Sequence, residues 1–105
     1  MTGLLLRNLV DGTIAEYPCD ALFIAVGHTP NTGIFRGQLD LDEMGYVVSP
    51  DGCETNVEGV FVAGDVNDLR YKQAITAAGS GCKAAMDAER YLEAIEYALR
   101  ETVST

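Results

Sequence analysis

An acidic residue between a short apolar run and a long helical pattern is the feature of this sequence best suited to chemistry. Residues 60–63 are apolar, and Gly64 and Asp65 follow them directly. In an open parallel sheet, ligands bind outside the carboxyl ends of the strands, where the chain turns into helices. Gly64 has no Cβ and permits close approach, and the Asp65 carboxylate can accept hydrogen bonds from sugar-type hydroxyls. The alternative is an aspartate that only closes a turn before a helix.

A second group of candidate residues stands where the expected helix begins. Lys72, Gln73 and Ala74 follow the polar turn 66–70, and helical spacing starts near Tyr71. The first N–H groups of a helix have no partner within it, and the helix dipole places partial positive charge there. This point therefore favours an electron-rich ligand. Taken alone, Lys72 and Gln73 are more simply described as the exposed first turn of a helix.

Short strands and one long helix are the elements expected to position these residues. Residues 4–10 and 13–17 flank Asp11-Gly12, a strong hairpin signal, and are expected to form paired strands. Residues 21–26 are nearly all apolar, as a strand buried on both faces should be, and residues 60–63 are expected to form another strand. The sequence thus predicts an α/β fold.

The long helix is expected from about residue 71 to beyond residue 92, because apolar residues recur there at intervals of three and four. Gly79 and Gly81 lie inside it, and each costs about 1 kcal/mol relative to alanine. Either another backbone or a cofactor packs closely against them, or the segment breaks into two helices. Four apolar residues at helical spacing are expected on its buried face: Ile75, Cys82, Ala85 and Leu92.

Charge and cysteine content restrict the partners and the compartment. The net charge of −9 argues against nucleic acid or an anionic membrane as partner. No apolar run approaches the roughly 18 residues of a membrane helix, and the amino terminus lacks the features of a signal peptide. Three widely spaced cysteines fit a reducing cytoplasm and no disulfide. With one histidine and no cysteine cluster, no metal site is expected.

Two longer runs resemble a known family. TNVEGVFVAGDV and then YKQAITAAGSGCKAAMDAERYL closely resemble the C-terminal FAD-binding segment of low-molecular-weight thioredoxin reductase. FIAVGHTPNT resembles the crossover between the nicotinamide and flavin domains of that family. The resemblance covers about residues 13–95. It implies a partial Rossmann-like domain, in which residues 1–27 correspond to the last strands of the NAD(P)H domain. Residues 28–105 then correspond to the C-terminal half of the FAD-binding domain.

The resemblance also implies cofactor contacts. Asp65 would hydrogen-bond the FAD chain between flavin and adenine, and Gly64 would permit that approach. Lys72, Gln73 and Ala74 would face the pyrimidine edge of the isoalloxazine. Many family members carry arginine where this chain has Lys72, which keeps the charge but loses the planar fork. FAD and NADPH are the implied cofactors of the parent enzyme, and thioredoxin is its implied partner.

Two kinds of motif that the family's complete enzymes use are absent from this sequence. These enzymes use one glycine-rich loop for FAD, a second for NADPH and a C-x-x-C pair. This sequence contains none of the three motifs in the required context. We therefore expect a C-terminal fragment without a catalytic residue of its own, inactive alone, whose partner is the missing N-terminal half. One alternative is a non-catalytic interaction module that pairs through an exposed half-domain surface, with itself or a second chain. Another is the tail of a different flavin reductase of this fold, such as that of a peroxidase system.

Overall fold

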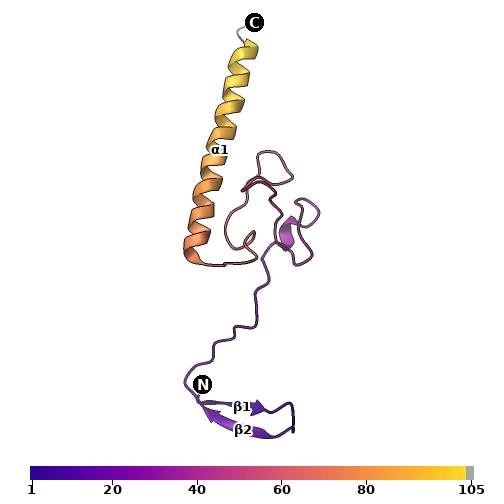
Figure 1. Ribbon diagram of the computed structural model, residues 1–105, viewed down its shortest axis with the longest axis vertical. Helices are drawn as coiled ribbons and strands as arrows, with labels where there is room; N and C mark the ends of the chain where they lie inside the picture. The colour runs from indigo at the N-terminus through magenta and orange to yellow at the C-terminus, as the bar shows by residue number, and fades with distance from the viewer. Residues whose placement is uncertain (104–105) are drawn as a thin grey trace.

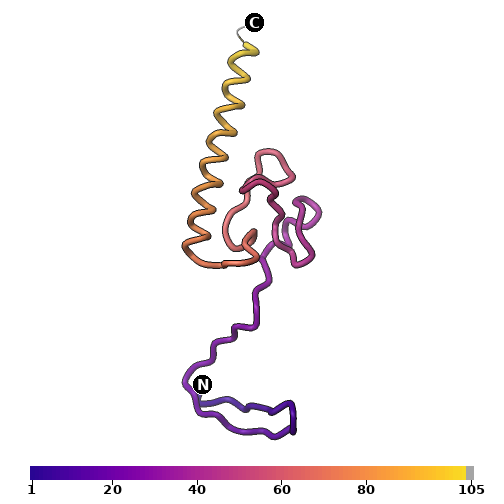
Figure 2. The backbone as a smooth tube through the Cα atoms, viewed as in Figure 1, coloured from indigo at the N-terminus to yellow at the C-terminus, as the bar shows by residue number. Residues whose placement is uncertain are grey.

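A computed structural model describes residues 1–103 of the chain (Figure 1). It contains two strands, one short 3-10 helix and one long α-helix: β1 (Gly3–Arg7), β2 (Ile14–Pro18), η1 (Gly33–Phe35) and α1 (Ala74–Val103). The molecule measures 81 × 26 × 20 Å. Its radius of gyration of 22.4 Å greatly exceeds the roughly 13 Å of a compact domain of about 100 residues. A hairpin, an extended segment and a folded part with α1 follow one another along the chain (Figure 2).

The hairpin at Asp11-Gly12 is confirmed. β1 and β2 pair antiparallel, and their turn is closed by hydrogen bonds from Asn8 N to Thr13 O (2.8 Å) and from Gly12 N to Asn8 O (2.9 Å). Gly12 has a φ of 76°, a conformation that glycine adopts without steric cost. The Asp11 carboxylate accepts hydrogen bonds from both the N–H and the hydroxyl of Thr13, at 2.9 and 2.7 Å. The turn is thus fixed by local groups that the sequence already displays.

The predicted strand over residues 21–26 is wrong. This part of the chain runs extended without regular structure, and Phe23, Ile24 and Val26 are 91%, 78% and 92% exposed. A strand that is buried on both faces needs neighbouring strands to take its backbone groups. Within residues 1–103, no strand lies beside this segment (Figure 2). The apolar composition predicts that this segment is buried, but among residues 1–103 no strand pairs with it and its large side chains stay exposed.

The folded part consists mainly of loops around a small core. Its buried apolar residues are Tyr46, Val47, Cys53 and Val62. The predicted strand over residues 60–63 is wrong, since only an isolated bridge pairs Glu54 with Phe61. Val62 N donates to Cys53 O over 2.8 Å, but Gly64, at a φ of 83°, then turns the chain away. The apolar run is therefore partly buried without continuing as a ladder.

α1 confirms the predicted helix, although it begins at Ala74 and not near Tyr71. Its 30 residues correspond to about 45 Å. Gly79 and Gly81 do not break it, so the two-helix alternative is wrong. A Cβ at either glycine would meet no neighbouring atom within 4 Å, so no described backbone packs closely there. No helix in residues 1–103 is both long enough and apolar enough to span a membrane.

The predicted buried face of α1 is also wrong. Ile75, Cys82, Ala85 and Leu92 are all exposed, Ile75 to 80% and Leu92 to 63%. The half-buried residues belong to another side of the helix: Thr76, Ala77, Ser80, Gly81, Ala84, Asp87, Ala88 and Tyr91. Most of these are small and let the loops approach α1, while Tyr91 packs edge-on against Phe61 at 6.0 Å between ring centroids. The side of α1 that is half-buried is therefore set by where the loops contact the helix, and not by where its large apolar side chains lie.

Candidate functional site

The turn that carries Gly64 and Asp65 is fastened on two sides. Gly64 N donates to the hydroxyl of Ser80 over 2.8 Å, which ties the turn to α1. On the other side, the Asn67 side-chain amide donates to Val47 O over 2.8 Å. Asn67 N donates to Gly64 O over 3.1 Å and closes the turn. Between these anchors the side chain of Asp65 is exposed, so its carboxylate can accept hydrogen bonds from a ligand.

One carboxylate organises the loop between this turn and α1. Asp68 Oδ1 accepts hydrogen bonds from Arg70 N at 2.9 Å and Tyr71 N at 2.7 Å. Its Oδ2 accepts them from Lys72 N at 2.8 Å and from the Thr76 hydroxyl at 3.2 Å. These bonds, led by that from Tyr71, hold the pKa of Asp68 below its ordinary value. Sequence reasoning missed Asp68, although an aspartate that bonds nearby backbone N–H groups is a known turn signal.

Lys72 is engaged inside the chain through both its backbone and its side chain. It has a φ of 50°, the left-handed region that L-residues other than asparagine and aspartate seldom adopt. Its ammonium nitrogen lies 4.9 Å from the ring centroid of buried Tyr46, a cation–π contact. The left-handed backbone interrupts the helical path and accounts for the start of α1 at Ala74.

Gln73 and Ala74 form the donor end of α1. Ala77 N donates to Gln73 O over 2.9 Å, so Gln73 is the residue that caps the helix. Gln73 N donates to the Thr76 hydroxyl over 3.2 Å, which satisfies one backbone donor next to the helix end. The N–H groups of Ala74 and Ile75 have no carbonyl partner within the helix by its geometry. This end of α1 therefore offers hydrogen-bond donors and partial positive charge.

All five residues expected to bind a cofactor thus border one loop, residues 64–74. The structure brings the Gly64 backbone to α1 through Ser80, and it places Lys72 to Ala74 at the start of the same helix.

Within residues 1–103, no three histidine, cysteine, aspartate or glutamate side chains gather so that they could hold a metal ion.

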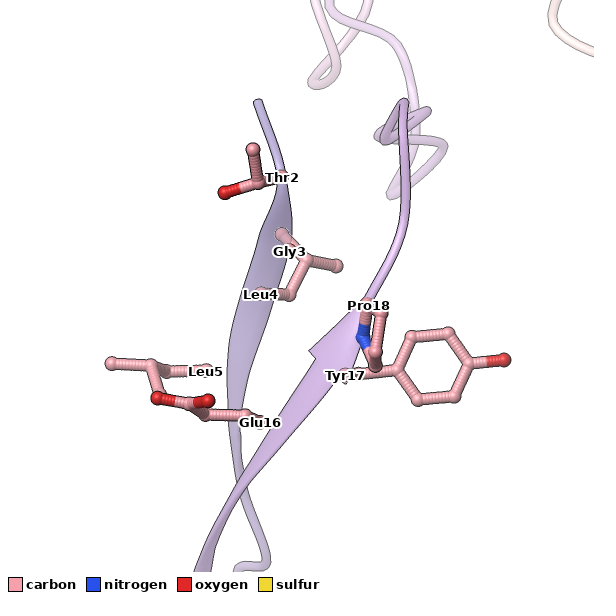
Figure 3. A pocket seen from close by; sticks show the side chains of 7 residues that line it. All are labelled: Thr2, Gly3, Leu4, Leu5, Glu16, Tyr17 and Pro18. Carbon is pink, nitrogen blue, oxygen red and sulfur yellow. The ribbon is translucent and has the colours of Figure 1, made fainter.

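A hollow of about 270 Å³ lies on the hairpin. The hairpin itself lies away from the start of α1 (Figure 1). It is lined by residues of β1 and β2 and of the adjoining terminus. Leu5 and Glu16 lie opposite each other on one side, while Tyr17 points the other way (Figure 3). A two-stranded ribbon exposes both faces, and the hollow takes no part in the candidate site.

The sequence profile of the pyridine nucleotide-disulphide oxidoreductases matches residues 4–81 of the 105 residues. The chain belongs to this family. A thioredoxin reductase of Streptomyces clavuligerus is 57% identical over 96 residues, which cover 90% of this chain and 30% of that protein. The mitochondrial thioredoxin reductase of Kluyveromyces lactis is 53% identical over 97 residues, 91% of this chain and 28% of that protein. The chain spans about 30% of the length of such relatives.

Solved structures of thioredoxin reductases contain the fold of this chain within about 30% of their own length. The crystal structure of thioredoxin reductase from Streptococcus pyogenes matches with a TM-score of 0.72 and 30% identity, over 89% of this chain and 30% of that one. That of T. acidophilum thioredoxin reductase matches with a TM-score of 0.70 and 36% identity, over 90% and 31%. The predicted resemblance and the predicted partial α/β fold are therefore confirmed.

Proposed function

We propose that this chain supplies the FAD-facing edge of a thioredoxin reductase-like flavoprotein that passes electrons from NADPH through FAD to a disulfide. The observation that carries the proposal is the identity of 57% over 96 residues with a thioredoxin reductase, in a segment that includes the whole 64–74 loop. The geometry agrees, because the turn of Asp65 and the donor end of α1 border the same loop.

The residues present fit FAD. Asp65 offers an exposed carboxylate to hydroxyl groups of the chain between flavin and adenine, and Gly64 leaves room for it. Lys72, Gln73 and Ala74 lie at the end of α1 where donors and partial positive charge favour the electron-rich pyrimidine edge of the ring. FAD, when bound, supplies the redox chemistry. These five residues bind and orient it, and none of them exchanges electrons.

The rest of the reaction requires residues beyond this set. We assign residues 1–27 to the end of an NAD(P)H domain and residues 28–105 to the C-terminal half of a FAD domain. The 105 residues hold no G-x-G-x-x-G loop after a strand and no C-x-x-C pair. These missing motifs belong to the N-terminal half of such an enzyme, and thioredoxin is the substrate of the complete enzyme in the cytoplasm.

Reconstitution tests this function. The purified chain is mixed with FAD and a Streptomyces clavuligerus thioredoxin reductase that lacks its matching 96-residue segment. We expect flavin to remain bound through gel filtration, and NADPH-dependent thioredoxin reduction to occur, only when both chains are present. Asp65→Ala should lower the retained flavin, whereas the matched Asp51→Ala, in an exposed turn, should not. Two chains that elute together but retain no flavin would refute the proposal.

A non-catalytic interaction module is the second candidate, and exposed apolar residues favour it. Leu9 and Val10 in the hairpin are 92% and 96% exposed, and Leu99 and Val103 in α1 are 61% and 87% exposed. Such surfaces typically mark interaction sites. The mass of the chain in solution separates the two functions. A stable, colourless oligomer that ignores the complementary chain would support the module, whereas a flavin-retaining complex with that chain would support the reductase part.

A further inference from the structure

The carboxylate of Asp68 gathers the backbone donors of the loop that leads into α1. Three consecutive backbone donors, those of Arg70, Tyr71 and Lys72, converge on the carboxylate of Asp68 at 2.7–2.9 Å. Consecutive N–H groups that converge in this way usually form an anion-binding concavity. Here the concavity is already filled by a carboxylate of the same chain. An external anion would therefore find its donors at the next N–H groups, in the first turn of α1.

Asp68 also supports an unfavourable backbone conformation. Lys72 occupies the left-handed region at a φ of 50°, where the Cβ of an L-residue is crowded. Two contacts hold it there: Lys72 N donates to Asp68 Oδ2 over 2.8 Å, and the Lys72 ammonium lies over the Tyr46 ring at 4.9 Å. Tyr46 is only 2% exposed, so the ring that Lys72 contacts is held in place by its neighbours.

The same carboxylate reaches the helix itself. The Thr76 hydroxyl lies 3.2 Å from Asp68 Oδ2 and 2.8 Å from Gln73 O, and it accepts the N–H of Gln73 at 3.2 Å. The hydroxyl carries one proton, so it donates to one of the two oxygens at a time. Through Thr76, Asp68 is connected to the residue that caps α1. A shift of the loop would therefore be felt at the first turn of the helix.

We propose that Asp68 is a positioning residue that fixes the direction in which the first-turn N–H groups of α1 face the cofactor. The inference rests on the proposed function, because that function places the cofactor at this end of α1. Asp68 itself has its acceptor oxygens occupied by the chain and touches no cofactor in this role. Its contribution is to hold Lys72 and Gln73 so that Ala74 and Ile75 present their donors.

The first experiment concerns the 105-residue chain alone. Amide hydrogen exchange is measured by NMR for the wild type, Asp68→Ala and Asp68→Asn, with Asp51→Asn as control for the loss of an exposed charge. In Asp68→Ala we expect the amides of Arg70, Tyr71 and Lys72 to exchange about ten-fold faster, since each loses a bond to a charged acceptor. Asp68→Asn keeps one acceptor oxygen, so only part of that protection should be lost.

The second experiment concerns the flavin in the reconstituted complex of the two chains. The dissociation constant of FAD, the visible absorption spectrum and the midpoint potential are measured below the unfolding temperature of every variant. Asp68→Ala should weaken FAD binding, shift the flavin spectrum and lower the potential, because misdirected donors stabilise the reduced ring less. Asp68→Asn should fall between Asp68→Ala and wild type, and Asp51→Asn should match wild type. A purely structural role would lower the unfolding temperature and leave the potential of the bound flavin unchanged.

The outcomes separate the two proposals. Unchanged amide exchange in Asp68→Ala would overturn the positioning role, whatever the flavin does. Faster exchange together with an unchanged flavin spectrum, potential and affinity would also overturn it, while the proposed function would stand. A wild-type complex that binds no FAD would overturn both, because no cofactor would remain to be positioned.

Discussion

The amide of Gly64 donates a 2.8 Å hydrogen bond to the hydroxyl of Ser80, and this bond joins the turn that carries Asp65 to α1. The Ser80 hydroxyl in turn donates to Ala77 O over 3.0 Å, so it bridges two backbone groups. The Ser80 carbonyl lies 3.7 Å from the thiol of buried Cys53. Ser80 is therefore the point at which the loops, the small core and the helix meet.

Replacement of Ser80 by alanine tests this junction. The Gly64 N–H would lose its partner in a half-buried position, so the free energy of unfolding should fall by about 1–2 kcal/mol. Urea unfolding followed by circular dichroism measures the change. Thr102→Ala is the control, because it removes a hydroxyl bonded to Ala98 O on the same helix, far from the loops. If both variants lose the same stability, the Gly64 bond contributes nothing beyond a helix-surface hydroxyl.

The acid stability of the loop should depend on Asp68. Hydrogen bonds, led by that from Tyr71 N, hold its pKa below the ordinary 3.8. A carboxylate with a lowered pKa in the folded state stabilises the fold fully above the pKa of the unfolded state. That stabilisation is lost as the pH falls from about 3.8 through the lower folded pKa.

A carboxyl NMR titration of wild type should therefore place the midpoint of Asp68 below 3.8. Unfolding curves of wild type and Asp68→Asn should differ at pH 6 and converge as the pH drops through that midpoint. Asp11, whose pKa is lowered by the backbone and hydroxyl of Thr13, provides an internal comparison in the hairpin turn. A midpoint for Asp68 at or above the ordinary value would contradict the bonding described for the loop.

The three thiols should react at different rates. Cys82 is exposed, Cys19 is half-buried and Cys53 is 2% exposed. Burial raises the pKa of Cys53, nearby Asp87 raises it further, and Lys83 opposes them. Since the thiolate is the reactive form, Cys53 should be the slowest to react with a chromogenic disulfide reagent at pH 8. Denaturant should reveal three free thiols at one rate.

Single variants assign these rates. Cys82→Ser should remove the fast phase of the native protein, and Cys53→Ser should remove the slow phase. Both variants conserve size closely, and the second serves as the test of burial. Loss of the fast phase in Cys53→Ser would show that the loop around residue 53 opens more readily than its burial indicates.

Local signals were sufficient to predict the hairpin and the helix. The turn at Asp11-Gly12 is closed by bonds within residues 8–13, and the spacing from residue 74 onward is that of a helix. Residues 21–26 failed as a strand because a strand depends on partners elsewhere in the chain or beyond it. The buried side of α1 failed for a similar reason, since Gly64, Phe61 and Cys53 select it through Ser80 and Tyr91.

The candidate site was predictable in part. Gly64, Asp65 and the start of α1 could be named because strand-to-helix turns favour ligands, and because two runs resemble a family. The internal contact of Lys72 with Tyr46 could not be named, because it joins residues 26 positions apart. Asp68 lies only four residues before Lys72, and its bonds are of a kind that turn chemistry produces.

A polypeptide of these 105 residues should not reduce disulfides with NADPH when it acts alone. Hydride transfer requires a nicotinamide held against the flavin, and a glycine-rich loop that opens a helix usually cradles each dinucleotide. Asp65 and the end of α1 offer only a few hydrogen bonds, each worth about 0.5–1.5 kcal/mol net. That is less than the several kcal/mol, on the order of 4–15, that association costs in lost freedom.

The thiols give the same expectation. A dithiol that passes electrons needs two cysteines whose Cα atoms lie within about 7 Å. Cys19, Cys53 and Cys82 are far apart in the sequence and form no C-x-x-C pair. Cys19 directly follows β2, whereas Cys53 lies in the small core of the folded part, so the two belong to separate parts of the chain. NADPH oxidation with added FAD and thioredoxin measures the activity, with the reconstituted two-chain complex as positive control. Sustained turnover by the chain alone, after removal of any contaminating complete reductase, would overturn this expectation.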